Sequence, residues 1–308
     1  MLDVSIIIVN YGTENYIINA IDSVIAKTKR ISYEVIIVDN ASPNDTFRVL
    51  EERYARQENI RCLRLDENVG FGRANNAGYE QSSGRYVLCL NPDTELRNNA
   101  IDILSDYLDN HPEAGGCGGN LFQKDGHLCG SYRMLFPSVS WEFSFMTYYV
   151  FEVLRYGRNR RYNMTGRPID VAIITGADLM IRRSVIESTG FFDPAFFMYY
   201  EDADLCYRIR KNGYRLTSVP QAEIYHYEGK SSKNLEGKAR LNFVGRNIFY
   251  TKHHSRAYCM VADALWGIAI ILRITALAFK KQSNRKYWAT LLQMLLAKYG
   301  NGRKLVHE

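Results

Sequence analysis

Apolar residues in the first hundred positions form short uninterrupted runs, and the segments between the runs have apolar residues at helical spacing. The runs cover residues 4–10, 35–38, 60–65 and 86–90. Uninterrupted runs of this length are typical of strands buried on both faces of a parallel sheet. The intervening segments predict helices, one capped by Thr13, one over 74–81, and one that buries Ile101, Leu104 and Leu108. This alternation predicts a mostly parallel, doubly wound α/β sheet with right-handed crossovers.

The pattern changes after Ala114. Asp125-Gly126 predicts a hairpin turn, and the aromatic, basic segment 136–167 has weak periodicity, which suggests a mobile region near a substrate. Further elements are expected as strands at 171–174, 179–181 and around Leu216 and Ile224, a helix at 203–212 ended by Gly213, and helical spacing from Leu235 onward. We therefore expect an α/β domain over residues 1–234, with halves at 1–119 and 120–234, followed by a helical region over 235–308.

Composition and charge narrow the class of protein. With 46% hydrophobic and 23% charged residues the chain is ordinary for a globular protein, which excludes general disorder. The net charge of +6 is concentrated in the arginine-rich segment 155–167, which contains no acid, and in the tail after Lys252. Basic segments beside aromatic residues suit anionic partners such as nucleic acid or lipid headgroups. The six cysteines form no CxxC pair, and the N-terminus has no secretory pattern, so we expect free core thiols and a cytoplasmic location.

Polar side chains stand at the ends of the predicted strands. The run that ends at Leu90 is followed by Asn91-Pro92-Asp93, and proline cannot continue a strand ladder. Because ligands of parallel sheets bind beyond the carboxyl ends of the strands, Asp93 is placed to hold a divalent cation. By the same argument Asp39 is placed to contact a nucleotide, and Asp202 to act as a general base. These positions predict an enzyme that handles a nucleotide diphosphate through a metal.

Each of these residues also has a purely structural interpretation. Asp39 could cap a turn formed with Ser42, and Asp93 could cap the following helix. Glu201, Asp202 and Asp204 could complement a helix dipole, while His226, between two tyrosines, could be a packed core residue. The glycine-rich stretch at 70–75 lacks the third glycine of a dinucleotide fingerprint, and no P-loop pattern occurs.

Seven short motifs occur in the order found in one enzyme family. They are Val4–Tyr11, Val38–Ser42, Asn68–Asn76, Asn91–Asp93, Thr175–Ala177, Phe192–Pro194 with Glu201–Asp202, and His226 with Gly229 and Ser231. On these motifs the chain resembles the inverting glycosyltransferases of family 2, in their bacterial rhamnosyltransferase-like branch. The resemblance covers roughly the first four-fifths of the chain.

The resemblance implies a Rossmann-like GT-A fold, with a nucleotide-sugar half over 1–119 and an acceptor half over 120–234. It implies that Asp202 is the catalytic base and that Asp93 and His226 ligate Mg or Mn. Contacts to the nucleotide sugar are expected from Tyr11, Asp39, Asn68, Gly70, Asn75 and Asn91, and contacts on the acceptor side from Glu201, Thr175 and Gly176. Asn91 departs from the family pattern, because many members carry a carboxylate at that place. The cation is therefore expected to be weakly held without donor.

The expected activity is the metal-dependent transfer of a sugar from a dTDP-, UDP- or GDP-linked donor to a hydroxyl of a glycan or polyprenyl-diphosphate-linked acceptor in surface polysaccharide synthesis. The resemblance favours rhamnose from dTDP-rhamnose. One alternative is a nucleotidyltransferase that makes nucleotide sugars, but its basic glycine-rich loop is replaced here by Tyr11–Glu14. Another is a noncatalytic nucleotide- or nucleic-acid-binding subunit. The retained carboxylates argue against that alternative, and no nucleic-acid partner is expected.

The tail after Ser255 is apolar with basic flanks. Asp263 and Arg273 interrupt its first segment, and the clean stretch 264–272 is far shorter than the ~20 residues that span a bilayer. The segment 286–298 fits a helix lying in the headgroup plane. We hypothesise that the tail holds the enzyme on the anionic inner face of the cell membrane. The alternatives are packing on the catalytic domain and a homodimer contact.

Overall fold

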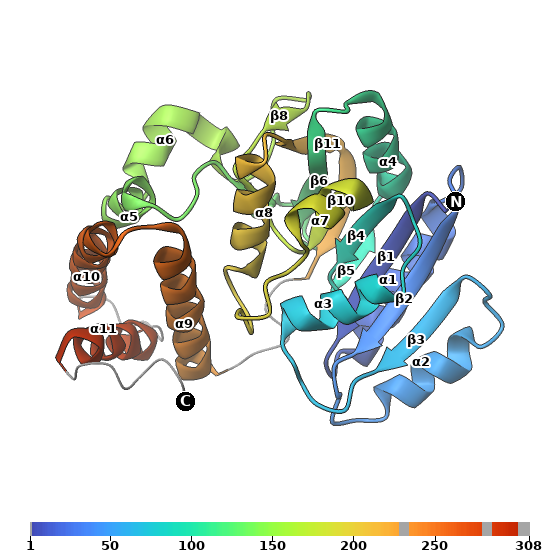
Figure 1. Ribbon diagram of the computed structural model, residues 1–308, viewed down its shortest axis with the longest axis horizontal. Coiled ribbons are helices and arrows are strands. Elements are labelled where there is room, and N and C mark those ends of the chain that lie inside the picture. Colours follow the sequence, from blue (N-terminus) through green and yellow to red (C-terminus); the bar gives the residue numbers. More distant parts are fainter. Residues whose placement is uncertain (1, 228–233, 279–284, 301–308) are drawn as a thin grey trace. The chain divides into compact units, whose positions relative to one another are not determined.

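The structure, a computed structural model, describes residues 2–227, 234–278 and 285–300, and it divides into two compact units (Figure 1). We call the first the α/β unit, which comprises 1–134, 158–197 and 201–231. The second, the helical unit, comprises 135–157, 198–200 and 232–308. The segment 135–157 therefore groups with the C-terminal helices, although it lies within the stretch expected to form the acceptor half.

The α/β unit is built on a nine-stranded sheet in the order β3-β2-β1-β4-β10-β6-β11-β5, with β8 also paired to β11. β3, β2, β1 and β4 are parallel, whereas β10 enters antiparallel between β4 and β6, and β6 and β11 are parallel again. The strands are β1 (Val4–Asn10), β2 (Tyr33–Asp39), β3 (Ile60–Arg64), β4 (Tyr86–Leu90), β5 (Thr94–Leu96), β6 (Ala114–Phe122), β8 (Ile169–Asp170), β10 (Asp178–Arg182) and β11 (Arg215–His226), with β7 (Tyr132–Arg133) and β9 (Ile173–Ile174) as a separate pair. The predicted fold class is confirmed.

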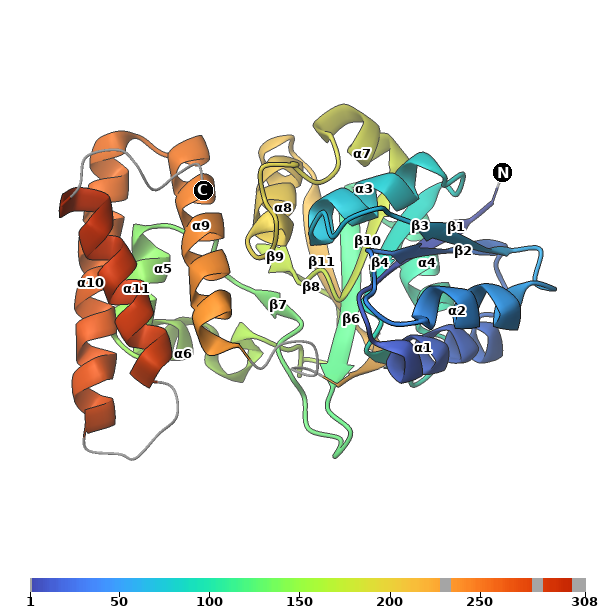
Figure 2. The same ribbon diagram turned by 90° about the horizontal axis from the view of Figure 1, so that it is seen from below.

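Helices cover both faces of this sheet, as Figure 2 shows for α1 and α2 on one side and α3, α7 and α8 on the other. They are α1 (Glu14–Lys27), α2 (Thr46–Tyr54), α3 (Phe71–Glu80), α4 (Ala100–Asn110), α7 (Arg183–Thr189) and α8 (Glu201–Lys211). The apolar positions of the predicted helices, among them Ile17, Ile21, Leu104 and Leu108, join the main core. Thr13 precedes α1 but does not cap it, because its hydroxyl donates to Asn10 Oδ1 at 2.7 Å.

Two further expectations are corrected by the structure. The weakly periodic segment 136–167 contains the helices α5 (Val139–Met146) and α6 (Val150–Tyr156) and the short helix η1 (Gly157–Arg160). Its periodicity is weak because both helices bury a glutamate on their inner side. The two strands expected around Leu216 and Ile224 are the single strand β11, with a register shift between Ser218 and Glu223. The predicted hairpin turn is present, with the N–H of Gly126 donating to the carbonyl of Gln123 at 2.9 Å.

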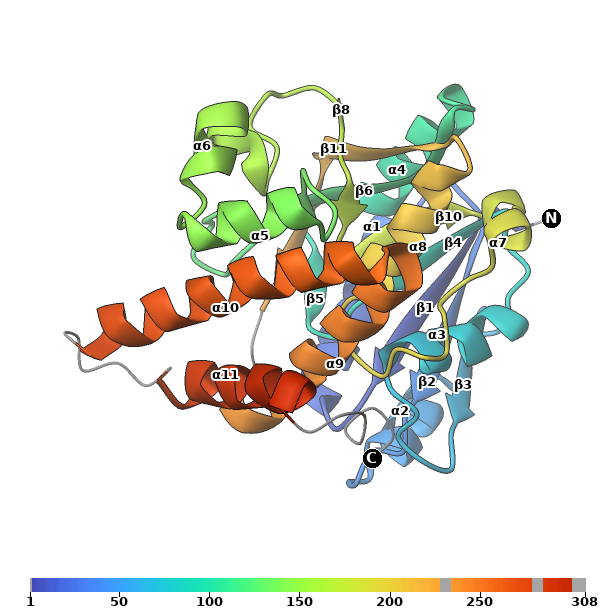
Figure 3. The same ribbon diagram turned by 60° about the vertical axis from the view of Figure 1, so that its left-hand side comes forward.

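The helical unit consists of α5, α6, α9 (Leu235–His253), α10 (Arg256–Ala278) and α11 (Arg285–Gly300). Figure 3 shows α10 running between α5 and α11, both of which it contacts. Its core gathers Ala239, Phe243, Trp266, Ile270, Leu291 and Leu295. The stretch Arg256–Ala276 of α10, 21 residues long, is long and apolar enough to cross a membrane, and 44% of an 18-residue segment within it is buried inside the protein. This length exceeds the expectation from the sequence, which treated Asp263 and Arg273 as interruptions.

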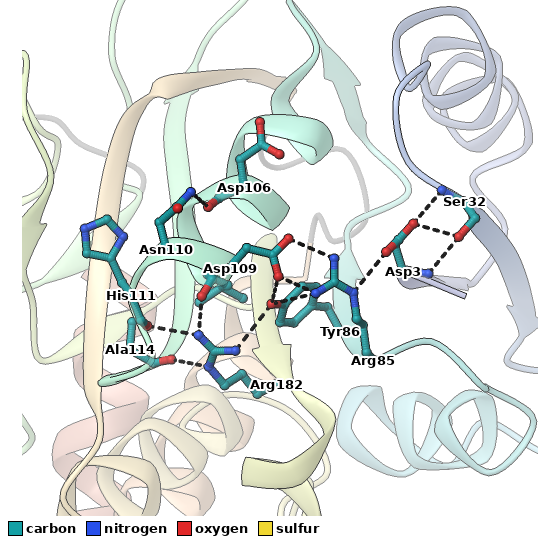
Figure 4. A network of polar contacts seen from close by, with 11 residues as sticks. Asp3, Ser32, Arg85, Tyr86, Asp106, Asp109, Asn110, His111, Ala114 and Arg182 are labelled. Carbon is teal, nitrogen blue, oxygen red and sulfur yellow. Dashed lines mark hydrogen bonds and ion pairs between the residues drawn. The ribbon is translucent and has the colours of Figure 1, made fainter. Parts of the chain in front are cut away.

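A polar network holds the edge of the sheet at which β4 begins (Figure 4). Arg85, directly before β4, donates to Asp3 at 2.9 Å and to Asp109 at 2.8 Å. Arg182, at the end of β10, donates to the carbonyls of Ala114 and His111 at 2.8 and 2.9 Å. The Arg182 guanidinium satisfies backbone acceptors around the C-terminal end of α4, which has no glycine cap, whereas Arg85 pairs with side-chain carboxylates. The carboxyl ends of β1, β2 and β4 lie at the opposite edge.

Candidate active site

The carboxyl ends of β1 and β2 bring two predicted positions together. Asn10 and Asp39 are register partners in the parallel pair, and Asn10 Nδ2 donates to Asp39 Oδ1 at 3.0 Å. Asp39 is fully buried, and it also accepts hydrogen bonds from the backbone N–H of Ser42 at 3.1 Å and from the Ser42 hydroxyl. Its turn-capping role is therefore present in the structure, and nucleotide binding by Asp39 remains a prediction. Tyr11, the residue after β1, is exposed at the same edge.

The loop before α3 lies beside this pair. Asn40, which follows Asp39, donates from Nδ2 to Asn68 Oδ1 at 3.0 Å, and its Oδ1 accepts the N–H of Val69 at 2.9 Å. Gly70 has φ +87° and ends the loop. These contacts hold Asn68 and Gly70 close to the end of β2. Asn75 is buried inside α3, where its amide donates to the carbonyl of Phe71 at 2.9 Å.

Asp93 and His226 meet across the pairing of β5 with β11. Thr94 and His226 are register partners, and His226 Nε2 lies 3.4 Å from Asp93 Oδ1 and 3.4 Å from Asn91 Nδ2. Asp93 does not cap a helix, because α4 begins at Ala100 after Asn99. Gly229 and Ser231, which the family motif places near His226, lie outside the described residues.

The side chains of Asp93, His226 and Asn91 offer ligands that suit a divalent cation. Within residues 2–227, 234–278 and 285–300, no three His, Cys, Asp or Glu side chains converge as a metal centre. Asp93 and His226 with the Asn91 amide supply one carboxylate, one imidazole and one amide. Mg²⁺ is usually bound by one or two carboxylates together with substrate phosphates and water. The donor set therefore fits a cation that is completed by a diphosphate.

The acidic start of α8 faces the segment between β9 and β10. Asp202 Oδ1 accepts the N–H of Ala203 at 2.7 Å, and its Oδ2 accepts the N–H of Gly176 at 3.4 Å. A Cβ atom on Gly176 would lie 3.0 Å from the Phe71 ring, so this position is crowded. Thr175 is anchored by its hydroxyl, which donates to the carbonyl of Ser131 at 3.2 Å. The acids in the first turn of α8 also suit the helix dipole, so their structural role is present, and catalysis by Asp202 remains a prediction.

The pKa values of the neighbouring carboxyl groups Glu201 and Asp202 are both raised. Burial, followed by the neighbouring Asp202 charge, raises the pKa of Glu201 to about 8. Burial also raises the pKa of Asp202, opposed by the backbone N–H groups of Ala203 and Gly176 and by Arg133. Two adjacent buried carboxyl groups cannot both ionise easily, so the state of the pair that carries one proton is favoured near neutral pH.

One side chain in this region was missed by sequence reasoning. Asp178, the first residue of β10, is fully buried and accepts the N–H of Gly119 at 2.6 Å. Burial raises the pKa of Asp178 to about 7, opposed by the Gly119 hydrogen bond and by the charge of His226. The residue directly follows the motif Thr175–Ala177, but it introduces an apolar strand and so looked like an ordinary strand boundary. A surface hollow lined by Tyr33, Glu34 and Arg61 lies at the opposite edge of β2, away from this site.

The sheet and its covering helices form the fold of the GT-A glycosyltransferases. Residues 5–190 match the model of glycosyl transferase family 2, and residues 120–300 match that of glycosyl transferase family group 2. The chain belongs to glycosyl transferase family 2, and its curated relatives place it in the rhamnosyltransferase-like branch, as the motifs predicted.

Two of these relatives are rhamnosyltransferases. The chain is 28% identical over 255 residues to the N-acetylglucosaminyl-diphospho-decaprenol L-rhamnosyltransferase of Mycobacterium tuberculosis, with 74% of each chain covered. It is 26% identical over 246 residues to the rhamnosyltransferase WbbL of Escherichia coli, which covers 77% of this chain and 88% of WbbL. Among solved structures, it is similar to the mannosyltransferase PcManGT from Pyrobaculum calidifontis in complex with GDP-Man and Mn²⁺. That match has a TM-score of 0.60 at 16% identity and covers 96% of this chain and 87% of that one.

Proposed function

We propose that this protein is an inverting, metal-dependent glycosyltransferase that moves rhamnose from dTDP-rhamnose to a hydroxyl of a lipid-linked acceptor. The observation that carries the proposal is the short segment 175–177, which connects the two halves of the site. The N–H of Asn91 donates to the carbonyl of Ala177 at 3.0 Å, and the N–H of Gly176 donates to Asp202 at 3.4 Å. The segment 175–177, which connects β9 to β10, therefore links the Asp93–His226 pair to the carboxyl groups of Glu201 and Asp202 at the start of α8.

The residues then have distinct tasks. Asp202 accepts the proton of the acceptor hydroxyl, whose oxygen attacks the anomeric carbon on the side opposite the diphosphate, so the configuration inverts. Asp39 accepts a hydrogen bond from the nucleotide, and Tyr11 and the loop at Asn68 and Gly70 border it. Asp93 and His226, with Asn91, would hold Mg or Mn. When bound, the cation neutralises charge that develops on the departing diphosphate.

The donor and the acceptor are inferred from the relatives. Both relatives described above are named as rhamnosyltransferases, and the mycobacterial name specifies a decaprenol-diphospho acceptor. A sugar attached to a polyprenyl diphosphate is therefore the acceptor class that we infer, in cytoplasmic synthesis of a surface polysaccharide. A related fold was solved with GDP-Man and Mn²⁺, which supports a nucleotide sugar and a divalent cation as ligands.

The donor is tested by a thermal-shift panel of dTDP-rhamnose, UDP-sugars and GDP-sugars, with and without Mn²⁺. We expect the largest stabilisation from dTDP-rhamnose with Mn²⁺, and we expect Asp93→Ala to lose the Mn²⁺-dependent part. A larger shift with a UDP- or GDP-sugar would reassign the donor. Formation of dTDP-rhamnose from dTTP and a sugar 1-phosphate would instead identify a nucleotidyltransferase.

The base is tested by Asp202→Asn. We expect this variant to bind donor as the wild type does and to lose transfer by a factor of at least about 10². Glu187→Gln, at an exposed position on α7, is the matched control and should keep full activity. Near wild-type turnover of Asp202→Asn would assign the base to another residue.

A further inference from the structure

The two charged residues within the apolar part of α10 point into the helical unit. Asp263 is buried and forms ion pairs with Arg246 at 2.5 Å and with Lys298 at 2.6 Å. Arg273 is buried too, and its guanidinium donates to the carbonyls of Ala269 at 3.1 Å and Phe145 at 2.6 Å. Neither charge interrupts the outward face of the helix.

That outward face is an apolar stripe. Met260 is 52% exposed, Ile268 47% and Ile271 49%. With Val261, Ala264 and Leu272 these residues recur at helical spacing, and from 257 to 276 the exposed positions of α10 carry no charge. We call these six residues the α10 stripe. Contiguous apolar surfaces of this kind mark contact sites for proteins or membranes.

The exposed apolar surface continues onto the hairpin of α5 and α6. The hydroxyl of Tyr148 donates to the carbonyl of Leu272 at 3.2 Å, which joins the hairpin to the stripe. Beyond it, Val150 and Val153 are exposed, and Leu154 is 82% exposed. The hairpin therefore adds exposed apolar residues next to a segment that is bonded to the end of the stripe.

The exposed charges of the helical unit are mostly positive. Glu142 and Glu152 are buried, the first paired with Arg246 and the second accepting a hydrogen bond from Ser144 at 3.0 Å. Among the described residues of the helical unit, Glu236 is the only exposed acid. The exposed bases are Arg155, Lys238, Arg240, Lys252, Arg256, Arg285 and Lys286.

We propose that the α10 stripe and the adjoining α5–α6 hairpin bind the surface of an anionic lipid bilayer, with α10 lying in the membrane plane. Basic flanks around an exposed apolar helix face are the features of an interfacial helix. A second copy of this basic unit would be repelled at the same face. A spanning α10 would expose Asp263 and Arg273 to lipid, which is costly. The membrane contact stands on these residues alone, whereas its use in reaching a lipid-linked acceptor rests on the proposed function.

The test is flotation of the full-length protein with phosphatidylcholine vesicles that either contain or lack phosphatidylglycerol. We expect binding only with phosphatidylglycerol, release by alkaline carbonate, and a drop of about tenfold in the bound fraction for the double variant Ile268→Glu/Ile271→Glu. The matched control is Val244→Glu, which introduces the same charge at a 44% exposed apolar position on α9, outside the proposed surface, and should bind as the wild type does.

Several results would overturn the proposal. The first is equal flotation of the double variant and the wild type, and the second is an equal loss in the Val244→Glu control. Resistance to carbonate would indicate a spanning helix. A dimer in sedimentation that the double variant converts to monomer, with flotation unchanged, would assign the stripe to a second copy. Thermal shifts with dTDP-rhamnose are measured on the same proteins and confirm that they are folded. They also distinguish a loss of membrane binding from a wrong assignment of the donor. The comparison of vesicles with and without phosphatidylglycerol tests the charge requirement on the unaltered protein.

Discussion

Two neighbouring carboxyl groups at the start of α8 differ in how they satisfy their oxygens. Asp202 accepts hydrogen bonds from two backbone N–H groups, those of Ala203 and Gly176. Glu201 is also buried, and its Oε2 has no hydrogen-bond partner among the described residues. Hydrogen bonds to the charged form favour ionisation, and burial without them opposes it. Ionisation of the pair is therefore more favourable on Asp202 than on Glu201, as the proposed role of Asp202 as the base requires.

This arrangement predicts a pH-dependent stability. The pKa of Glu201 is raised from 4.5 to about 8, so the folded state prefers the protonated form, and stability falls as the pH rises from about 4.5 to 8. We expect Glu201→Gln to remove that fall, so that its free energy of unfolding relative to wild type increases with pH by on the order of 2–4 kcal/mol. Urea unfolding at pH 5, 7 and 9 measures the difference, with the exposed Glu187→Gln as control. Parallel pH profiles of Glu201→Gln and wild type would contradict the assignment.

The backbone at the start of α3 lies very close to the backbone of the segment that precedes α8. The N–H of Phe71, at the start of α3, donates to the carbonyl of Phe197 at 2.9 Å, and Phe197 lies four residues before α8. A Cβ atom on Gly70 would lie 2.2 Å from that carbonyl oxygen, and Gly70 has φ +87°. Only glycine tolerates both the positive φ angle and the close contact. Gly70 is therefore required where the start of α3 packs against the segment before α8.

Gly70→Ala tests this junction. We expect a loss of about 3 kcal/mol or more in the free energy of unfolding, because the new methyl group collides with backbone and the φ angle is strained. Gly126→Ala is a matched control, since Gly126 has φ +84° and no atom within 4 Å of the added Cβ. The control should lose only about 1 kcal/mol, which is the conformational part of the cost. Equal losses in chemical denaturation would show that the contact with Phe197 is unimportant.

The two compact units differ in what fills their interiors. The core of the α/β unit is apolar, with strands such as β1 and β4 buried along their whole length. The helical unit instead buries Arg246, which bridges Glu142 at 2.9 Å and Asp263 at 2.5 Å and lies over the Tyr250 and Trp266 rings. Buried ion pairs contribute little net stability but are costly to break, because the partner that remains is an uncompensated charge. The helical unit therefore depends on one arginine that joins α5, α9 and α10.

Arg246→Met is expected to destabilise the helical unit by about 3–5 kcal/mol, since Glu142 and Asp263 lose their common partner. Burial already raises the pKa of Glu142, and the loss of Arg246 would raise it further. Hydrogen exchange of amides in α5, α9 and α10 measures the effect. Arg240→Met, at an exposed position on the same helix, is the control and should leave exchange unchanged. Equal amide protection in both variants would show that the ion pairs of Arg246 do not stabilise the helical unit.

Local patterns in the sequence were sufficient for the first four strands and for the positions at which they end, but not for α5, α6 and β11. Continuous apolar runs predicted β1, β2, β3 and β4, because a strand buried on both faces leaves no position for a polar residue. A proline or a turn after each run marked where the strands stop, which located Asp39 and Asp93. The family motifs then indicated the class of enzyme, and the comparisons confirmed it.

Contacts between segments that are distant in the sequence determined which polar side chains are buried and what each of them is bonded to. No local pattern shows that Asp39 bonds to Asn10, that Gly176 donates to Asp202, or that Asp178 is buried near His226. The same holds for Asp263, which looked like an interruption of an apolar helix and is an internal ion pair. The physical reason is that a polar group can be buried only if it is neutralised or hydrogen-bonded, and its partners here come from segments that only folding brings together.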